Sequence, residues 1–463
     1  MRRSVLILLI LGLFLALGAG GRAAEAPDGA GHGGPVVPVL LGLVVILAAA
    51  KVGGEIFERV GQPAVLGELL FGMLLGNLAL FGFGGLAFLG TSPGIEILAQ
   101  LGVILLLFQV GLESNVGEML SVGWSSLLVA VLGVIAPFFL GWGVSAWLLP
   151  GEETLAHVFI GATLAATSVG ITARVLADLG KLSARESKII LGAAVIDDVL
   201  GLVILSVISG IIGAANTGGT LDAMDAFAIV AKAIAFLVGA ILIGGWLSRR
   251  VFRLAGVLKV QGMLLALALA ICFLLAYLAD RIGLATIVGA FAAGLILDGV
   301  HYRDLGERTK HTIEELIHPI AGFLVPVFFV LMGVRVDLST FTRTGVLGFA
   351  ALLTLAAIVG KMICAAGVVE RGLDRVSVAV GMVPRGEVGL IFAGIGAQLQ
   401  LHGRPVIVPA VFAAVVVMVI VTTLVTPPAL KITLARGDRW KAKRKTPAPP
   451  PEAPMEGPKT RLG

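Results

Sequence analysis

Long apolar runs separated by short polar loops make up most of the chain. A membrane-spanning helix needs about 20 mostly apolar residues, and thirteen runs of roughly this length follow residue 35. They lie near residues 36–54, 64–83, 94–112, 123–149, 154–177, 188–213, 224–247, 261–280, 283–299, 318–334, 344–367, 375–399 and 405–430. The pattern predicts an all-α polytopic membrane protein with thirteen transmembrane helices.

The two ends of the chain depart from this pattern. Residues 1–26 hold two arginines, an apolar run and the small-x-small sequence Ala24-Glu25-Ala26, which is the layout of a secretory signal peptide. An uncleaved additional helix is the alternative. Residues 431–463 are basic and then proline-rich, which predicts a disordered cytoplasmic tail. The transmembrane domain is therefore predicted over residues 36–430.

Composition agrees with a membrane location. Of the 463 residues, 58% are hydrophobic and 14% are charged, and the mean hydropathy is +1.03. Soluble domains carry about 25% charged residues. The two cysteines, Cys272 and Cys364, stand alone inside apolar runs. This spacing excludes a disulfide framework and a CxxC metal site.

The distribution of positive charge predicts the orientation in the lipid bilayer. If the mature chain starts outside, the predicted cytoplasmic loops and tail hold 24 Lys and Arg residues, and the external loops hold four. Positive residues are concentrated on the cytoplasmic side of membrane proteins. We therefore expect the N-terminus outside and the C-terminus in the cytoplasm. The same distribution accounts for the net charge of +5, so no nucleic-acid partner is expected.

Thirteen spans can be divided into two inverted halves of six helices joined by one linking helix, a common plan of secondary transporters. In each half the fifth run carries polar residues and helix breakers at mid-depth. Thr163, Thr167, Ser168, Gly170 and Thr172 interrupt residues 154–177, and Gly381, Pro384, Arg385, Gly386 and Glu387 interrupt residues 375–399. Paired, crossing broken helices predict an ion site at the membrane midplane, because freed carbonyls and half-helix ends can face an ion there.

Two neighbouring acids, Asp197 and Asp198, lie inside the apolar run 188–213. A charge at bilayer depth costs about 2.5–3.5 kcal/mol, so each acid needs a partner or a purpose. Neighbouring residues project about 100° apart on a helix, so the two acids face different surroundings. Burial and repulsion between like charges favour the protonated form of a carboxylate. Such a group can hold a proton or a small cation, and competition between the two is the basis of exchange.

Other polar residues complete the predicted site. The hydroxyls of Thr167 and Ser168, with carbonyls of the broken helix, are the hard oxygen ligands that suit sodium. Lys361, in the middle of its apolar run, is the natural counter-charge for one of the two aspartates. Arg385 and Glu387 are interpreted as a second charge set, which supports the broken helix more than it carries ions.

Seven motifs occur in order along the chain: GQPAVLGELLFGMLLGN, LLLFQVGLE, ATSVGITARVL, AAVIDDVLGL, FFVLMGVRVDL, VGKMICA and GMVPRGEVGLI. Together they resemble the bacterial monovalent cation:proton antiporter-2 family, in particular its NapA-like sodium/proton antiporters. The resemblance implies a homodimer in the bacterial inner membrane with a role in pH homeostasis. It also implies an elevator-like movement of a transport core, at about residues 123–213 and 344–430, against a dimerisation panel, at about residues 36–112 and 261–334.

The same resemblance assigns roles within the site. It implies that Asp198 binds the cation or the proton, with Thr167 and Ser168 beside it, and that Asp197 is the partner of Lys361. In the family a lysine at this position is associated with exchange of more than one proton per sodium. No cofactor is implied, because sodium and protons are the transported substrates. Lithium and potassium are alternative cations.

Three other functions are alternatives to sodium/proton exchange. A potassium/proton antiporter is the nearest, although its relatives usually carry a cytoplasmic nucleotide-binding domain that residues 431–463 are too short to form. A cation channel is less favoured, because charges inside broken helices suit alternating access better than open conduction. An intramembrane aspartyl protease needs acids from two different segments, whereas Asp197 and Asp198 are neighbours. The sequence therefore predicts a transporter and not an enzyme.

Overall fold

The structure is a computed structural model that describes residues 36–113, 123–181, 184–216, 231–232, 234–255, 262–297, 312–342, 345–370 and 372–445. The predicted signal peptide at residues 1–26 lies outside the described residues, as does the end of the predicted tail at residues 446–463.

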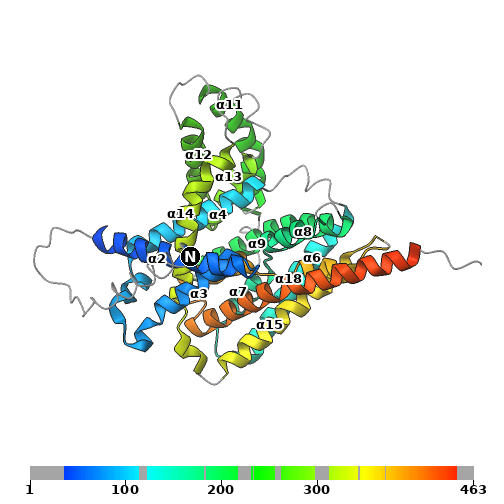
Figure 1. Ribbon diagram of the computed structural model, residues 1–463. Helices are drawn as coiled ribbons and strands as arrows, with labels where there is room; N and C mark the ends of the chain where they lie inside the picture. Colours follow the sequence, from blue (N-terminus) through cyan, green and yellow to red (C-terminus); the bar gives the residue numbers. More distant parts are fainter. Residues whose placement is uncertain are drawn as a thin grey trace, which may run out of the picture.

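Helices form nearly all of the described chain (Figure 1). In chain order they are α2 (Val36–Arg59), α3 (Ala64–Gly76), α4 (Pro93–Glu113), α6 (Trp124–Leu148), α7 (Thr154–Ala165), α8 (Val169–Asp178), α9 (Arg185–Asn216), α11 (Gly245–Ala255), α12 (Met263–Arg281), α13 (Thr286–Ile296), α14 (Ile313–Val334), α15 (Val346–Ile363), α16 (Arg375–Gly381), α17 (Gly386–Gln398) and α18 (Pro409–Lys445). Shorter elements are the 3₁₀ turns η1 (Leu78–Phe81), η2 (Gly84–Gly90), η4 (Leu338–Thr342) and η5 (Cys364–Gly367), the π-helical turn η3 (Ala240–Gly244), and the strands β1 (Gln400–Leu401) and β2 (Arg404–Pro405).

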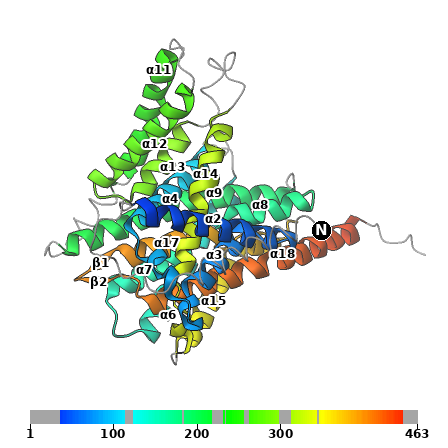
Figure 2. The same cartoon turned by 60° about the vertical axis from the view of Figure 1, so that its left-hand side comes forward.

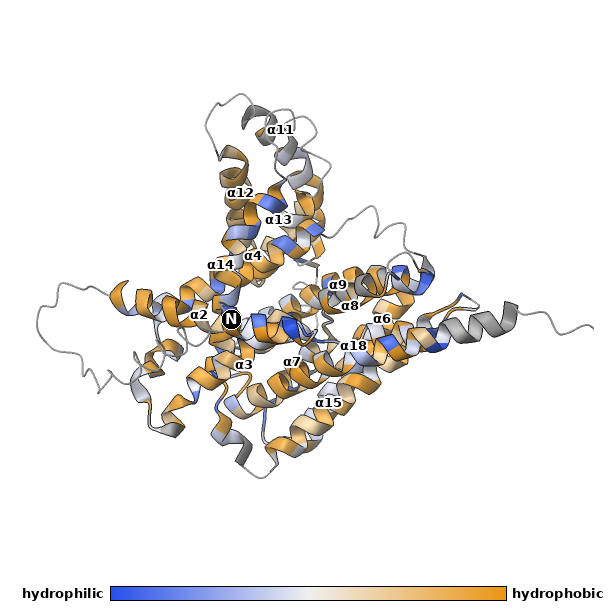
Figure 3. Ribbon diagram, in the orientation of Figure 1, coloured by the Kyte–Doolittle hydropathy of each residue, from blue (hydrophilic) through white to orange (hydrophobic). Residues whose placement is uncertain are grey.

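Many of the described helices can cross a membrane. Eight are long and apolar enough, or nine if the bent pair of α16 and α17 counts as one span. Figure 3 shows that apolar residues dominate these helices. The prediction of a helical, polytopic membrane protein is thus confirmed. Four shorter apolar helices, Ala64–Gly76, Thr154–Ala165, Ile234–Ser248 and Thr286–Ile296, lie in four of the other predicted runs. The number of thirteen spans and the inverted repeats stay predictions.

Two exposed tryptophans mark the ends of α6. Trp124 and Trp147 are 76% and 73% exposed, and the helix between them spans about 35 Å at about 1.5 Å per residue. The hydrocarbon core of a bilayer is about 30 Å thick, and tryptophan gathers at both of its interfaces. The length of α6 and the residues at its ends therefore match a membrane-spanning helix.

The helices pack in two groups. In the first group α4 packs against α13 and α14, α3 packs against α2 and α14, and α12 packs against α13. In the second group α6 packs against α7, α9 and α15, and α18 packs against α15, α16 and α17. Figure 1 shows α11, α12 and α13 at one edge of the molecule and α6, α15 and α18 at another. The hairpin of β1 and β2 joins α17 to α18 and lies near α7 (Figure 2).

Glycines bring the backbones of the first group into direct contact. A Cβ atom added at Gly67 on α3 would overlap the backbone carbonyl of Gly53 on α2, and one added at Gly72 would overlap the carbonyl of Val330 on α14. Small residues allow membrane helices to approach this closely, so that van der Waals contacts hold them together.

Replacing Gly67 by alanine is expected to lower the melting temperature of the protein by several degrees, because overpacking a close contact costs about 1–3 kcal/mol. The matched control is Gly348→Ala on α15, where an added Cβ has nothing within 4 Å. Thermal unfolding in detergent measures both. Equal melting temperatures for the two variants would contradict the close α2–α3 contact.

The last helix corrects one sequence prediction. α18 continues through Pro427 and Pro428 to Lys445, whereas the sequence predicted a span that ends at residue 430 and disorder from residue 431. Leu430 and Leu434 are buried in a cluster that includes residues of α9 and α16. This packing anchors the helix at Leu434, beyond the end of the predicted apolar run.

Candidate functional site

Two breaks in the helices meet near the centre of the second group. α7 ends at Ala165 and α8 begins at Val169, while α16 ends at Gly381 and α17 begins at Gly386 with a bend of 45°. Both interruptions predicted from the sequence are therefore present. The backbone N–H of Ser168 in the first break donates to the carbonyl of Pro384 in the second, at 2.9 Å. This bond shows that the two breaks are in direct contact.

The residues of the second break explain its shape. Pro384 has no backbone N–H to donate within a helix and disfavours a helical conformation at the preceding residue. Gly386 has a φ of +40°, and a Cβ added there would press against the side chain of Ser168. Only glycine meets both conditions, so this position allows the two breaks to approach each other. The hydroxyl of Thr172 adds a second link by donating to the carbonyl of Gly381 at 2.7 Å.

Asp197 and Lys361 form a buried ion pair. The Nζ atom of Lys361 on α15 lies 2.9 Å from Oδ1 of Asp197 on α9, and both side chains are 0% exposed. Gly133 on α6 covers the pair, since a Cβ added there would lie 3.3 Å from Nζ. A buried charge is tolerated only when it is paired, so each of these residues requires the other.

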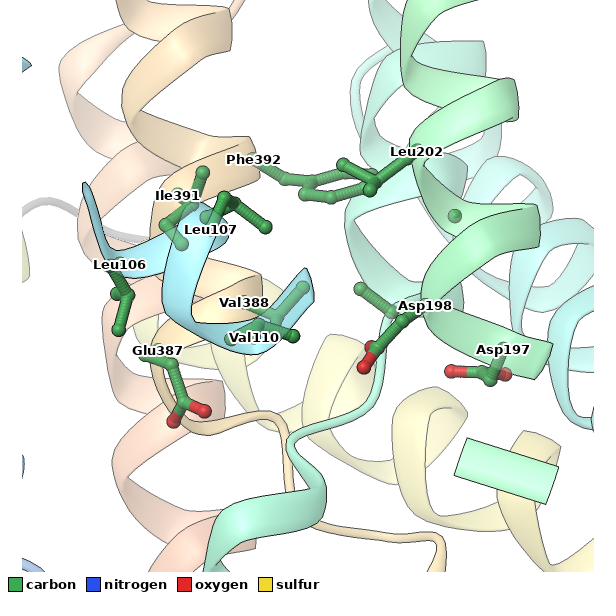
Figure 4. A pocket seen from close by; sticks show the side chains of 12 residues that line it. Leu106, Leu107, Val110, Asp197, Asp198, Leu202, Glu387, Val388, Ile391 and Phe392 are labelled. Atoms are coloured by element: carbon green, nitrogen blue, oxygen red, sulfur yellow. The ribbon is translucent and has the colours of Figure 1, made fainter. Parts of the chain in front are cut away.

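The side chain of Asp198 points in a different direction from that of Asp197, as expected because neighbouring residues project about 100° apart on a helix. It lines a small cavity of about 20 Å³ together with Glu387 and apolar side chains of α4 and α17 (Figure 4). Its Oδ1 atom is buried and has no hydrogen-bond partner. A cavity of this size holds about one water-sized particle. Asp198 therefore presents an unsatisfied carboxylate oxygen next to space for a single small ion.

Arg385 and Glu387 point in different directions. The guanidinium of Arg385 is fully buried and donates to the carbonyls of Ala166 and Ala357. Glu387 instead lines the cavity of Asp198 and accepts a hydrogen bond of 2.6 Å from the hydroxyl of Ser168. Arg385 thus links the first break to α15. The place of Glu387 inside the cavity was not anticipated from the sequence.

The two predicted hydroxyl ligands differ in their surroundings. Ser168 is engaged with Glu387. The Oγ1 atom of Thr167 is buried and has no hydrogen-bond partner. The residue of this break that lines the cavity is Ala166. Thr167 and Ser168 therefore follow the cavity-lining residue Ala166 by one and two positions in the sequence. The hydroxyl oxygen of Thr167 has no hydrogen-bond partner and could accept a ligand.

A wider cavity of about 700 Å³ lies between the two groups of helices, lined by α4, α9, α17 and the residues that join α12 to α13. Ile391 lines both this cavity and the smaller one. At its rim Glu96 on α4 accepts hydrogen bonds from Arg335, which follows α14, and from Gln398 at the end of α17, the latter at 2.8 Å. This rim contact joins the first group of helices to the second.

Broken helices in contact with each other, with buried carboxylates beside them, are typical of secondary active transporters, which hold the ion at such a point. A family model, described as the transmembrane sodium/hydrogen exchanger, matches residues 42–432. The chain belongs to the sodium/hydrogen exchanger family.

Known relatives cover most of the chain. The high-affinity Na(+)/H(+) antiporter NhaS3 of Synechocystis sp. is 40% identical over 449 residues, which cover 89% of this chain and 93% of the relative. The Na(+)/H(+)-K(+) antiporter GerN of Bacillus cereus is 38% identical over 406 residues, which cover 86% and 96%. Both are transporters and not enzymes, which agrees with the class predicted from the sequence.

A solved structure shares the fold. The sodium proton antiporter MjNhaP1 from Methanocaldococcus jannaschii matches with a TM-score of 0.63 at 16% sequence identity, over 88% of this chain and 98% of that chain.

Proposed function

We propose that this protein exchanges sodium for protons across the membrane, with Asp198 as the group that binds either one. The observation that carries the proposal is that Asp198 lines a cavity of about 20 Å³ beside the two breaks and has a buried carboxylate oxygen without a hydrogen-bond partner. Membership of the family and the relatives named as Na(+)/H(+) antiporters support the same function.

Competition at a single carboxylate couples the two fluxes. A sodium ion and a proton each neutralise the charge of Asp198, so only one of them occupies the group at a time. Thr167, Ser168 and the carbonyls of the broken helix complete the set of oxygen ligands as the ion enters. Asp197 keeps its own partner, Lys361, and holds α9 against α15 close to the ion.

An elevator-like movement fits the packing of the helices. The second group, which contains both breaks and the ion pair, corresponds to the predicted transport core at about residues 123–213 and 344–430. The first group, with its close glycine contacts, corresponds to the predicted panel at about residues 36–112 and 261–334, on which a second copy would form the homodimer. Sliding of the core along the panel carries Asp198 from one side of the membrane to the other.

The protein is expected in a bacterial inner membrane, and the excess of Lys and Arg in the predicted cytoplasmic loops supports an orientation with the N-terminus outside and the C-terminus inside. Glu96, Asp280 and Gln398 then lie toward the outside, and the cavity of about 700 Å³ that they line is the external approach to the site. Ile391, which borders both cavities, separates this approach from Asp198.

Potassium is the second candidate cation. The relative GerN is named as a Na(+)/H(+)-K(+) antiporter, and carboxylate, hydroxyl and carbonyl oxygens can bind either ion.

The purified protein in liposomes tests the proposal. With the membrane potential clamped, an imposed sodium gradient is expected to move protons in the opposite direction, and a potassium gradient is expected to move fewer. A response to potassium that equals the response to sodium would favour the potassium alternative. Cation flux without opposite proton movement would indicate a channel and contradict the proposal.

A further inference from the structure

The rim of the wider cavity holds a contact between the two groups of helices that the exchange reaction at Asp198 does not use. Glu96 stands in the first turn of α4, in the first group, and Gln398 is the last residue of α17, in the second. The Nε2 atom of Gln398 donates to Oε1 of Glu96 at 2.8 Å. This bond joins a residue of the predicted panel to a residue of the predicted transport core.

Other residues of the first group hold Glu96 in place. Arg335, which follows α14, donates to Oε2 of Glu96, and Gln100, one turn further along α4, donates to Oε1 at 3.1 Å. The side chains of Glu96 and Arg335 are 22% and 28% exposed. An ionised carboxylate can accept several hydrogen bonds at once. Glu96 therefore presents a fixed and charged acceptor to the second group of helices.

The position of Arg335 depends in turn on the end of α3. Asn77 directly follows α3 and is 5% exposed. Its side-chain amide donates to the carbonyl of Val336 at 2.7 Å, and its Oδ1 atom accepts from the backbone N–H of Leu338 at 2.9 Å. These two bonds fix the chain immediately after Arg335. The polar end of the motif FFVLMGVRVDL thus places the guanidinium of Arg335 beside Glu96.

Inside the wider cavity the two groups meet through apolar side chains. A Cβ atom added at Gly394 on α17 would lie 2.9 Å from Sδ of Met332 on α14, and Phe328 of α14 and Ile391 of α17 line the same cavity. Apolar contacts are not directional, so one group can shift along the other without losing a specific partner. The hydrogen bond at the rim is directional and requires one relative position of the two groups.

We propose that the hydrogen bond from Gln398 to Glu96 is a latch that holds the transport core at the outer end of its movement, with Arg335 as the residue that positions Glu96. The inference rests on the elevator-like movement in the proposed function. While the latch is closed, the cavity of about 700 Å³ forms the approach from the outside. Movement of the core toward the cytoplasm carries Gln398 away from Glu96, so the latch opens once in each cycle.

The latch affects the two sides of the membrane in opposite directions. The apparent KM on one side rises as the fraction of protein that faces this side falls. The KM for external sodium divided by the KM for internal sodium is therefore proportional to the ratio of inward-facing to outward-facing protein. Loss of a hydrogen bond to a charged acceptor at a partly exposed site is expected to change this ratio about fivefold.

The first experiment measures the two KM values for sodium in liposomes that hold the protein in one orientation. We expect their ratio to rise about fivefold for Gln398→Ala, which lacks the donor, and to fall for Gln398→Lys, whose ammonium group can form an ion pair with Glu96. The matched control is Gln400→Ala, at a position where the backbone carbonyl, which alanine keeps, accepts the hydrogen bond from Asn216. A change that only weakened the fold would lower the rate and leave the ratio unaltered.

The second experiment joins the two groups covalently. The double variant Glu96→Cys with Gln398→Cys is treated with a short bis-methanethiosulfonate, which links two thiols and is released by a reductant. The native Cys272 and Cys364 are both 0% exposed, so the reagent reaches the introduced thiols. We expect the linked protein to lose sodium-driven proton movement and to regain it on reduction, because the latch can no longer open.

The control for the link is Glu55→Cys with Arg59→Cys. These exposed residues form an ion pair of 2.7 Å within α2, so a link between them lies inside the first group and should leave transport unchanged.

Three results would overturn the inference. The first is a linked Glu96→Cys/Gln398→Cys protein that still transports, and the second is a failure of this pair to link under conditions that link the control pair. The third is a KM ratio for Gln398→Ala equal to that for Gln400→Ala, which decides the matter even if the double variant fails to fold. In each case the unmodified protein would still move protons in response to sodium, and sodium/proton exchange would stand. A lack of such movement in the unmodified protein would instead refute the proposed function.

Discussion

Replacement of Asp198 by asparagine is expected to reduce sodium-driven proton movement to the level of protein-free liposomes. Asparagine keeps nearly the same shape, so the cavity of about 20 Å³ that Asp198 lines should persist. It can neither carry a negative charge nor release a proton at physiological pH. The variant therefore removes both competing reactions at once and leaves the surrounding packing in place.

The matched control is Asp337→Asn, which makes the same chemical change at an exposed turn. There Oδ1 of Asp337 accepts a hydrogen bond from the backbone N–H of Ser339 at 2.8 Å, and the carbonyl oxygen of asparagine can accept the same bond. This control should transport normally. The fluorescence of a pH-sensitive dye in proteoliposomes measures proton movement for both variants. If Asp198→Asn retained a sodium-dependent signal, Asp198 would not be the ion-binding group.

Replacement of Lys361 by glutamine is expected to produce the largest loss of stability among the changes considered. The variant leaves Asp197 charged, 0% exposed and without its cation. Breaking a buried ion pair in this way costs about 3–5 kcal/mol, because the remaining charge has been removed from water and has no partner. The double variant Asp197→Asn with Lys361→Gln removes both charges and should recover much of the loss.

Thermal unfolding in detergent distinguishes these cases. Lys188→Gln is the control, because Lys188 is an exposed residue on the same helix as Asp197, and surface changes of this kind stay within about 0.5 kcal/mol. If Lys361→Gln melted together with this control, or if the double variant were no more stable than the single one, the ion pair would not be holding α9 against α15.

The sequence predicted the membrane class well because lipid imposes a simple condition. Every backbone polar group must be satisfied inside the span, so long apolar runs have to be helices. The same condition made the breaks visible, since Pro384 and the polar residues around Ser168 cannot continue a lipid-exposed helix. It did not predict the end of α18, because Leu430 and Leu434 extend that helix through contacts with other helices that no local pattern encodes.

The site was predicted in part for a similar reason. The angle between neighbouring side chains on a helix is fixed at about 100°. The different directions of Asp197 and Asp198 therefore follow from their being adjacent in the sequence. Arg385 and Glu387 flank Gly386, whose φ of +40° departs from helical geometry. The relative direction of these two side chains therefore depends on the bend of the chain and could not be inferred from their spacing.

The bond from the Ser168 N–H to the Pro384 carbonyl has a consequence for protein engineering. It joins the two breaks into a single structural part, and only a glycine at position 386 leaves room for the side chain of Ser168. In the proposed site, ion preference is therefore expected to depend on the pair of segments and not on either one. A chimera that takes the first break from a relative with another preference needs the second break from the same relative.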